Sequence, residues 1–174
     1  MQFSPKHSNM PDIHSTERIF YLHIPKTAGS TINKIFLSNH DEDEALTHIE
    51  SKNIFDGKEC NSGPNIYRYL SGHIKYPFLR NNLDLKDWTT ICTFRKPDEH
   101  LASHISWVRL LGEPGHENRL KQHGENIQEI VNHIKNVDLS SPSQIRDLIS
   151  WLEDNNQYLF HNTQTRYLWG QGHP

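Results

Sequence analysis

One short loop carries the residues best suited to chemistry. The segment HIPKTAGST (residues 23–31) follows an apolar run at 18–24 that is typical of a strand buried on both faces. Its small residues leave backbone N–H groups exposed, and the positive end of the helix expected next points at the same place. Lys26 adds a positive charge, and hydroxyl donors come from Thr27, Ser30 and Thr31. This pattern predicts a nest for a phosphate or sulfate group, although an ordinary strand–helix turn fits the same letters.

A second segment, TFRKPDEHLASH at 93–104, follows another expected strand. Arg95 lies at the exit of that strand, where the ligands of open α/β sheets gather. Ser103 follows eight positions later, inside the expected helix. A planar guanidinium and a hydroxyl that converge there can hold a second phosphate. Read alone, Arg95 also fits a surface ion pair and Ser103 a neutral helix position.

The elements that position these loops follow an alternating order. The patterns predict strands at 18–24, 66–70 and 88–94, with helices after the first and third of them and two further amphipathic helices between residues 127 and 152. Strands separated by helices indicate an α/β fold with three αβα layers and a small, mostly parallel sheet. At 174 residues we expect one domain, residues 17–174, behind a loose lead-in at residues 1–16.

Composition narrows the class of protein. Eighteen Lys and Arg against 21 Asp and Glu give a net charge of −3, so no overall positive field favours nucleic acid as a partner. No run approaches the roughly 20 apolar residues that cross a bilayer, and the N-terminus lacks a signal-peptide pattern. Two cysteines, Cys60 and Cys92, are too few for a disulfide framework. We therefore expect a cytoplasmic protein as the chain stands, or a Golgi lumenal one if a leader or anchor was removed.

Three short segments, the two described above and one near the end of the chain, together carry a resemblance to a known family. HIPKTAGST resembles the 5'-phosphosulfate-binding loop of sulfotransferases that use 3'-phosphoadenosine 5'-phosphosulfate (PAPS), and TFRKPDEHLASH resembles their 3'-phosphate element, R-D-P-x-x-R-x-x-S. NTQTRYL at 162–168 is similar to a segment near the end of those domains. The most similar branch holds the heparan sulfate 2-O- and 6-O-sulfotransferases and small bacterial relatives. The resemblance implies a P-loop-like sulfotransferase fold.

The resemblance also implies roles for individual residues. Lys26 would contact the bridging oxygen and the 5'-phosphate, and Arg95 and Ser103 would hold the 3'-phosphate. The phosphosulfate would be held by Thr27, Ala28, Gly29, Ser30 and Thr31. His73, in a Gly-His pair after the second expected strand, would be the catalytic base. PAPS would be the co-substrate and adenosine 3',5'-bisphosphate the product, with no metal ion required.

His73 also suits this role by its chemistry, because an unperturbed imidazole titrates near neutral pH. Lys75 and Arg166 are further candidates for contact with the acceptor, which the resemblance implies is a hydroxyl-bearing compound, most often a glycan. The least patterned stretch, 112–140, is expected to shape the choice of acceptor.

The sequence departs from the family at three places. Lys96 and His100 replace the usual Asp and second Arg of the 3'-phosphate element, and the chain ends at Pro174 soon after the NTQTR segment. We therefore expect a C-terminally truncated or minimal relative.

Two other functions remain open on the sequence. One is a non-catalytic PAPS- or phosphate-binding remnant. The other is a P-loop kinase-like phosphotransferase, although Lys26 precedes Gly29, whereas the triphosphate loop G-x-x-x-x-G-K-[ST] has its lysine after the second glycine. Such a kinase would need acidic residues to hold Mg²⁺. His100 and His104 have the four-residue spacing of paired metal ligands, but polar residues without a metal fit them better.

Overall fold

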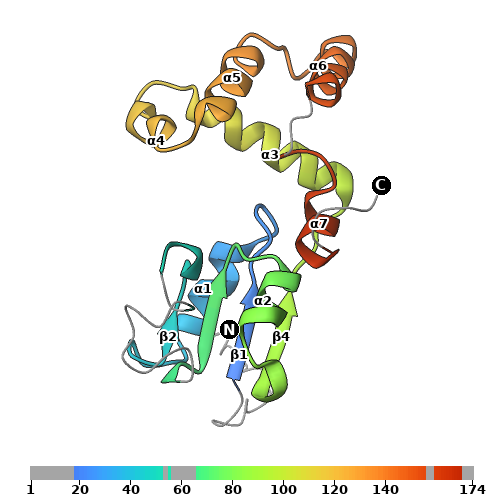
Figure 1. The fold of residues 1–174 in the computed structure, drawn as a ribbon. Coiled ribbons are helices and arrows are strands. Elements are labelled where there is room, and N and C mark those ends of the chain that lie inside the picture. The colour runs from blue at the N-terminus through green and yellow to red at the C-terminus, as the bar shows by residue number, and fades with distance from the viewer. Residues whose placement is uncertain (1–17, 53–54, 56–65, 156–158, 170–174) are drawn as a thin grey trace, which may run out of the picture.

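The chain folds around a small parallel sheet from which one long helix leads to a group of helices (Figure 1). This computed structural model describes residues 18–52, 55, 66–155 and 159–169. Within those residues it holds four strands and seven α-helices. The strands are β1 (Arg18–Leu22), β2 (Ala45–Leu46), β3 (Tyr69–Gly72) and β4 (Trp88–Cys92). The α-helices are α1 (Gly29–Leu37), α2 (Tyr76–Asn82), α3 (Pro97–Leu111), α4 (Glu117–Lys121), α5 (Glu125–Ile134), α6 (Pro142–Asp154) and α7 (Thr163–Trp169).

The sheet has the strand order β2-β3-β1-β4, and every pair of neighbours is parallel. Leu22 at the end of β1 is in register with Gly72 at the end of β3 and with Cys92 at the end of β4. The chain segments that leave these three strands therefore start at the same edge of the sheet. This alignment brings together loops that are far apart in the sequence.

Both faces of the sheet are covered, because side chains alternate between faces along a strand. Ile19 and Tyr21 of β1 pack with Ile32 and Phe36 of α1 on one face. Phe20 and Leu22 face the other way and join a cluster that includes Leu79 of α2 and Leu168 of α7. The helix–sheet–helix layers confirm the predicted α/β fold with a small parallel sheet.

A second hydrophobic cluster lies at the far end of α3. It joins that helix to α5 and α6, and its buried members are Ile105, Val108, Leu111, Ile130, Val131, Ile134, Leu148 and Leu152. Figure 1 shows α3 extending away from the sheet, with α4, α5 and α6 gathered around its distal part. We call this group the helical lobe. Helix α7 then returns to the sheet and contacts α2.

Several local expectations need correction. Strands β1 and β4 end two residues earlier than predicted, at Leu22 and Cys92, and β3 runs from Tyr69 to Gly72 rather than over 66–70. Elements β2, α2, α4 and α7 were not predicted; each is seven residues or shorter. Short elements hold too few apolar positions to show a period. Cys60 lies outside the described residues, and Cys92 is half-buried beside the sheet core.

Helix α6 begins at Pro142, where the pattern Ser141-Pro142-Ser143-Gln144 indicates a capping box. The Ser141 side chain makes no capping hydrogen bond and instead lies 3.0 Å from the Ser143 hydroxyl. The Gln144 side chain accepts from the backbone N–H of Asp138 at 2.8 Å. The helix thus begins where this sequence pattern indicates, but the hydrogen bonds of a capping box do not form.

Candidate functional site

The loop at 25–28, between β1 and α1, has an unusual backbone. Lys26 (φ 66°) and Ala28 (φ 75°) both lie in the left-handed region, which residues other than glycine rarely adopt. Such conformations cost free energy and persist where the surroundings fix them, often at functional sites. Here the backbone N–H groups of Thr31 and Ile32 both donate to the Ala28 carbonyl, at 3.0 and 3.1 Å. The loop therefore turns sharply into the first turn of α1.

Thr27 fixes this loop from the inside. Its side chain is buried, its hydroxyl donates to the Ile24 carbonyl at 2.8 Å, and it lies 3.1 Å from the Thr93 hydroxyl. Thr93 in turn donates to the Thr27 carbonyl at 2.6 Å, which joins the loop after β1 to the end of β4. The Thr27 side chain is thus committed to the protein, whereas Ala28, Gly29, Ser30 and Thr31 line an open cleft.

Gly29 is needed because the ring of His23 lies against it. A Cβ atom at position 29 would overlap the His23 ring. His23 itself is buried, and burial, with smaller electrostatic contributions from His73 and His48, lowers its pKa to about 4. His23 is therefore neutral at physiological pH, and its ring packs against Gly29 at the start of α1.

The cleft has a volume of about 820 Å³ and lies at the carboxyl edge of the sheet, between the sheet and the helical lobe. From the sheet side it is lined by His23, Pro25, Lys26, Ala28, Gly29, Ser30, Thr31, His48, His73 and Arg95, and from the helical side by Ser103, His104, Trp107, Arg119, Gln122, His123 and Leu159. Lys26, Arg95 and Arg119 are its permanent cations. Among the described residues that line it, none is acidic. The cleft therefore favours an anion.

Lys26 extends from the loop toward the helical lobe. Its ammonium lies 5.8 Å from the centre of the Trp107 ring, which is a cation–π contact with α3. Burial lowers the pKa of Lys26, and so do the charges of Arg119 and Arg95. An anion bound between these three cations would relieve their mutual repulsion.

Arg95 is held in place by a side chain from α7. The Gln164 amide accepts a hydrogen bond from the Arg95 backbone N–H and donates one to the Arg95 carbonyl, both at 2.9 Å. The structure therefore joins the second and third of the sequence segments directly. Arg166 lies on the same helix but does not line the cleft; its guanidinium donates to the Thr163 hydroxyl at 3.4 Å.

His73 follows β3 and has a defined orientation. Its Nδ1 atom lies 2.7 Å from the His23 carbonyl oxygen, and its ring packs on the His23 ring at 4.1 Å between centres. Because a carbonyl oxygen only accepts, Nδ1 carries the proton and Nε2 keeps a free electron pair in the neutral imidazole. The backbone N–H of His73 donates to the Glu50 carboxylate at 2.9 Å. His73 is thus positioned to accept a proton at Nε2.

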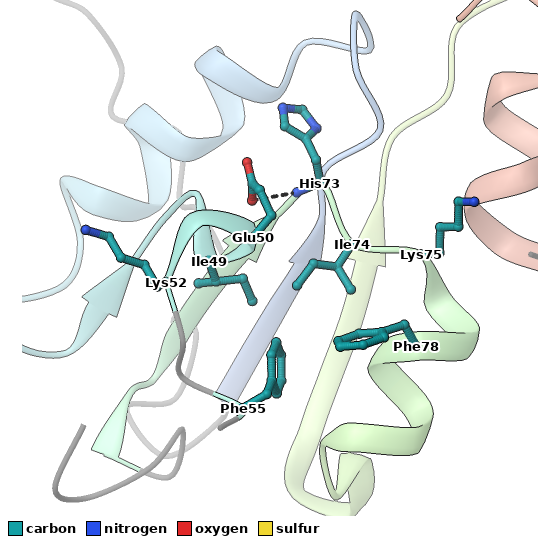
Figure 2. A pocket seen from close by; sticks show the side chains of 8 residues that line it. All are labelled: Ile49, Glu50, Lys52, Phe55, His73, Ile74, Lys75 and Phe78. Atoms are coloured by element: carbon teal, nitrogen blue, oxygen red, sulfur yellow. Dashed lines mark hydrogen bonds between the residues drawn. The ribbon is translucent and has the colours of Figure 1, made fainter. Parts of the chain in front are cut away.

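A second hollow of about 390 Å³ shares His73 and lies on the other side of Glu50 (Figure 2). Ile49, Ile74, Phe55 and Phe78 give it apolar walls. Lys52 and Lys75 also line it, and Figure 2 shows both side chains pointing away from the aromatic pair. The structure therefore places Lys75 beside this hollow and not in the cleft.

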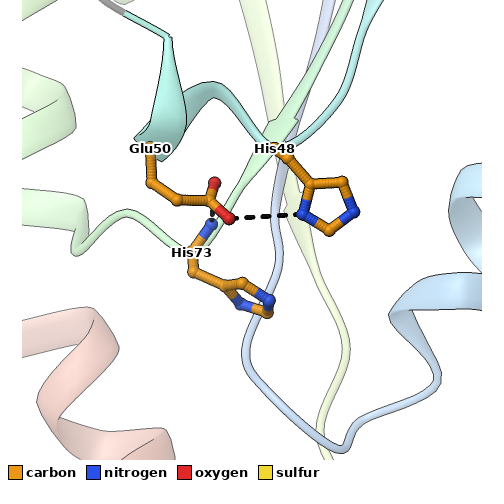
Figure 3. Close-up of side chains that lie close together, drawn as sticks. All are labelled: His48, Glu50 and His73. Carbon is orange, nitrogen blue, oxygen red and sulfur yellow. Dashed lines mark hydrogen bonds and ion pairs between the residues drawn. The ribbon is translucent and has the colours of Figure 1, made fainter. Parts of the chain in front are cut away.

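His100 and His104 are buried on α3 rather than exposed. The His100 Nε2 donates to the Pro25 carbonyl at 2.8 Å, so this histidine fixes the loop that precedes Lys26. Burial, with the positive charges of His100 and Lys26, lowers the pKa of His104 to about 4. Within the described residues, the side chains grouped closely enough to hold a metal ion are His48, Glu50 and His73 (Figure 3).

Sequence reasoning missed His23, His48, Glu50 and Arg119. The first three are brought to His73 by the strand register and by the turn at 48–51, neither of which leaves a local pattern. Arg119 belongs to the short helix α4 inside the polar stretch that follows α3. The sequence shows basic residues in the stretch between the helices α3 and α5, but this pattern does not distinguish Arg119 from its basic neighbour Lys121.

No protein-family model, no curated protein and no solved structure matches this chain. Within the described ranges, none of the helices has the length and apolar character needed to cross a membrane.

Proposed function

We propose that this protein is a sulfotransferase that moves a sulfuryl group from PAPS to a hydroxyl of an acceptor, most often a carbohydrate. One observation carries the proposal: Lys26, residues 28–31, Arg95, Ser103 and His73 line a single cleft, although 77 positions separate Lys26 from Ser103. A strand, a tight loop and a helix in succession, with β1 inside a parallel sheet, also support the P-loop-like fold implied by the resemblance.

Two groups of residues would bind the nucleotide. The Lys26 ammonium and the backbone N–H groups of residues 28–30 would hold the 5'-phosphosulfate at the start of α1, with the hydroxyls of Ser30 and Thr31 beside them. Arg95 and Ser103 would hold the 3'-phosphate, with Gln164 fixing the Arg95 backbone. Thr27 contributes to this arrangement by shaping the loop, because its hydroxyl is already bonded to Ile24.

The reaction would be an in-line displacement at sulfur. The acceptor oxygen forms a new S–O bond while the bond from sulfur to the bridging oxygen breaks and its electron pair stays on the 5'-phosphate. His73 Nε2 takes the acceptor proton, a step typically worth 10²- to 10⁴-fold in rate. Lys26 and the loop N–H groups stabilise the charge that builds on the departing phosphate, and they are in place before the reaction starts.

His73 fits the base because its proton lies on Nδ1, toward the His23 carbonyl. It also lines both the cleft and the second hollow, so an acceptor could approach it from the hollow while the nucleotide fills the cleft. Lys75 would meet the acceptor there. Arg119, Gln122 and His123 close the cleft from the helical side, in the stretch that we expect to shape the choice of acceptor.

The phosphotransferase alternative is less well supported by this cleft. Kinase chemistry relies on acidic side chains to hold Mg²⁺, and none of the described cleft-lining residues is acidic. A non-catalytic phosphate-binding role would use the same cleft but would give the His73 side chain no part. The hydrogen bond from His73 Nδ1 to the His23 carbonyl, which leaves Nε2 able to accept a proton, therefore supports the catalytic role.

Transfer of labelled sulfate from PAPS to a panel of glycans and simple alcohols tests the proposal. We expect a sulfated product with the wild-type protein and none with Lys26→Ala. Binding of adenosine 3',5'-bisphosphate without any transfer would favour the non-catalytic alternative. Binding of ATP–Mg²⁺ in its place would favour a phosphotransferase.

A further inference from the structure

Three side chains beside the cleft form a set of possible metal ligands, and two of them, His48 and Glu50, have no part in the proposed reaction. One ligand atom each from His48, Glu50 and His73 lies within 4.8 Å of the other two. Figure 3 shows the Glu50 carboxylate beside the His48 ring, with His48 Nδ1 3.3 Å from Oε1, and hydrogen-bonded to the backbone N–H of His73. Two imidazoles and one carboxylate are a donor set typical of borderline divalent metal ions.

The turn that presents His48 and Glu50 is rigidly built. His48 has a φ of 56°, in the left-handed region, and its carbonyl accepts both the backbone N–H and the hydroxyl of Ser51, at 3.0 and 2.8 Å. Gly72 lies beneath the carboxylate, where a Cβ atom would come within 2.7 Å of Glu50 Oε2. The strained His48 backbone and the absent side chain at Gly72 thus bring the carboxylate to the two histidines.

The backbone also prepares His73 as a ligand. Histidines that bind metal usually donate their other ring N–H to a carbonyl or a carboxylate, which fixes the tautomer. The Nδ1 of His73 has that arrangement with the His23 carbonyl at 2.7 Å, which leaves the Nε2 electron pair available.

We propose that His48, Glu50 and His73 form a binding site for a divalent transition-metal ion, with Zn²⁺ the best match. Tetrahedral zinc with bonds of about 2.0–2.1 Å places its ligand atoms about 3.4 Å apart. The His48 and Glu50 side chains are 60% and 30% exposed, so small rotations bring them together. Three protein ligands leave the fourth position to water, on the side where His48 and His73 line the cleft.

Such a site would compete with the proposed reaction. A metal ion on His73 Nε2 occupies the electron pair that would accept the acceptor proton. Zinc would therefore inhibit sulfotransfer, a consequence that rests on the proposed function. The metal site itself does not depend on that function.

Titration of the metal-free protein with ZnCl₂, followed by calorimetry, tests the site without any nucleotide. We expect one tight equivalent of Zn²⁺ that weakens at least tenfold in His48→Ala and in Glu50→Gln. His161→Ala replaces an exposed histidine that lines neither the cleft nor the second hollow; it is the matched control and should keep the tight equivalent. Co²⁺ should give the visible spectrum of a four-coordinate ion in the wild type and in the control only.

Absence of a tight equivalent in the wild type would overturn the proposal, as would equal affinity in the wild type and both ligand variants. Loss of binding in His161→Ala to the same extent would also overturn it. If zinc binds as expected but no acceptor is ever sulfated, the metal site stands and the proposed function fails. If sulfate is transferred and zinc neither binds nor inhibits, the proposed function stands and the metal site fails.

Discussion

The Nδ1 atom of His73 lies 2.7 Å from the backbone carbonyl oxygen of His23, and the two rings are in contact, tilted by 33° with their centres 4.1 Å apart. The backbone N–H of His23 in turn donates to the carbonyl of Gly72 at 3.0 Å. The ends of β1 and β3 therefore fix each other. Because the loop after β1 carries Lys26 and the segment after β3 carries His73, this pairing sets the proposed leaving-group stabiliser relative to the proposed base.

His73→Ala should remove turnover and spare nucleotide binding. Loss of a positioned base typically costs 10²- to 10⁴-fold in rate, whereas His73 lies outside the loop that would hold the phosphates. The measurements are kcat for sulfate transfer and the Kd for adenosine 3',5'-bisphosphate. A comparable loss of affinity and rate would show that His73 belongs to the nucleotide site and would contradict its role as the base.

Gly29→Ala should destabilise the protein and weaken nucleotide binding, because the added methyl overlaps the His23 ring. Overpacking of this kind costs about 1–3 kcal/mol. Urea unfolding measures the change. Gly124→Ala is the matched control: a Cβ there meets nothing within 4 Å, so the change causes no overpacking, and an alanine at a helix N-cap in place of glycine costs about 0.5–1 kcal/mol. Equal losses in the two variants would mean that His23 yields freely and does not constrain α1.

Arg95→Ala should abolish the preference for a 3'-phosphate. A hydrogen bond to a charged group contributes about 1.5–3 kcal/mol, which is roughly 10- to 150-fold in affinity. The Kd for adenosine 3',5'-bisphosphate should rise by that factor, while the Kd for adenosine 5'-phosphate should stay within about twofold. Arg146→Ala, an exposed arginine on α6 away from the cleft, is the control. Parallel weakening of both nucleotides in Arg95→Ala would exclude contact with the 3'-phosphate.

Stability should fall as the pH drops from 7 toward 4. The His104 pKa is about 4 in the folded protein, because of burial and the nearby charges of His100 and Lys26, and about 6.5 when unfolded. The unfolded chain thus binds more protons between these values, and lowering the pH favours it. For His104 alone the loss at pH 5 is at most roughly 2 kcal/mol.

Urea unfolding at pH 7.5 and pH 5 checks this expectation, with His104→Phe and His161→Phe compared. The wild type and His161→Phe should lose stability on acidification, and His104→Phe should lose less. An undiminished loss in His104→Phe would assign the effect to other groups, such as His23, whose pKa is also about 4.

The sheet core and the loop between β1 and α1 were the parts most predictable from sequence. The apolar run at 18–24 and the small residues after Lys26 give strong local signals, so β1, the loop and α1 were predicted together. The strand ends then bring Arg95 and His73 to the same edge through the parallel register. Gln164 could be noticed only as part of a family-like segment, since its two hydrogen bonds to Arg95 span 69 positions.

The remainder depends on packing that no local pattern records. Thr27 is a hydroxyl donor by type, but tertiary contacts with Ile24 and Thr93 occupy it. Helix α2 begins with Tyr76 and Pro77, and the proline was an available start signal. The turn that brings Glu50 to His73 follows a two-residue strand and has no periodicity. These residues gain their positions only when the sheet edge forms.

Calorimetric titration with adenosine 3',5'-bisphosphate, with no added metal, tests most directly whether the loop at 26–31 holds the end of the nucleotide. The wild type should bind one equivalent, and Lys26→Ala should bind at least tenfold more weakly. Lys34→Ala, which removes an exposed lysine of the helix after this loop, α1, should bind as the wild type does. Failure of the wild type to bind, or the same affinity in Lys26→Ala as in Lys34→Ala, would contradict the assignment of this loop.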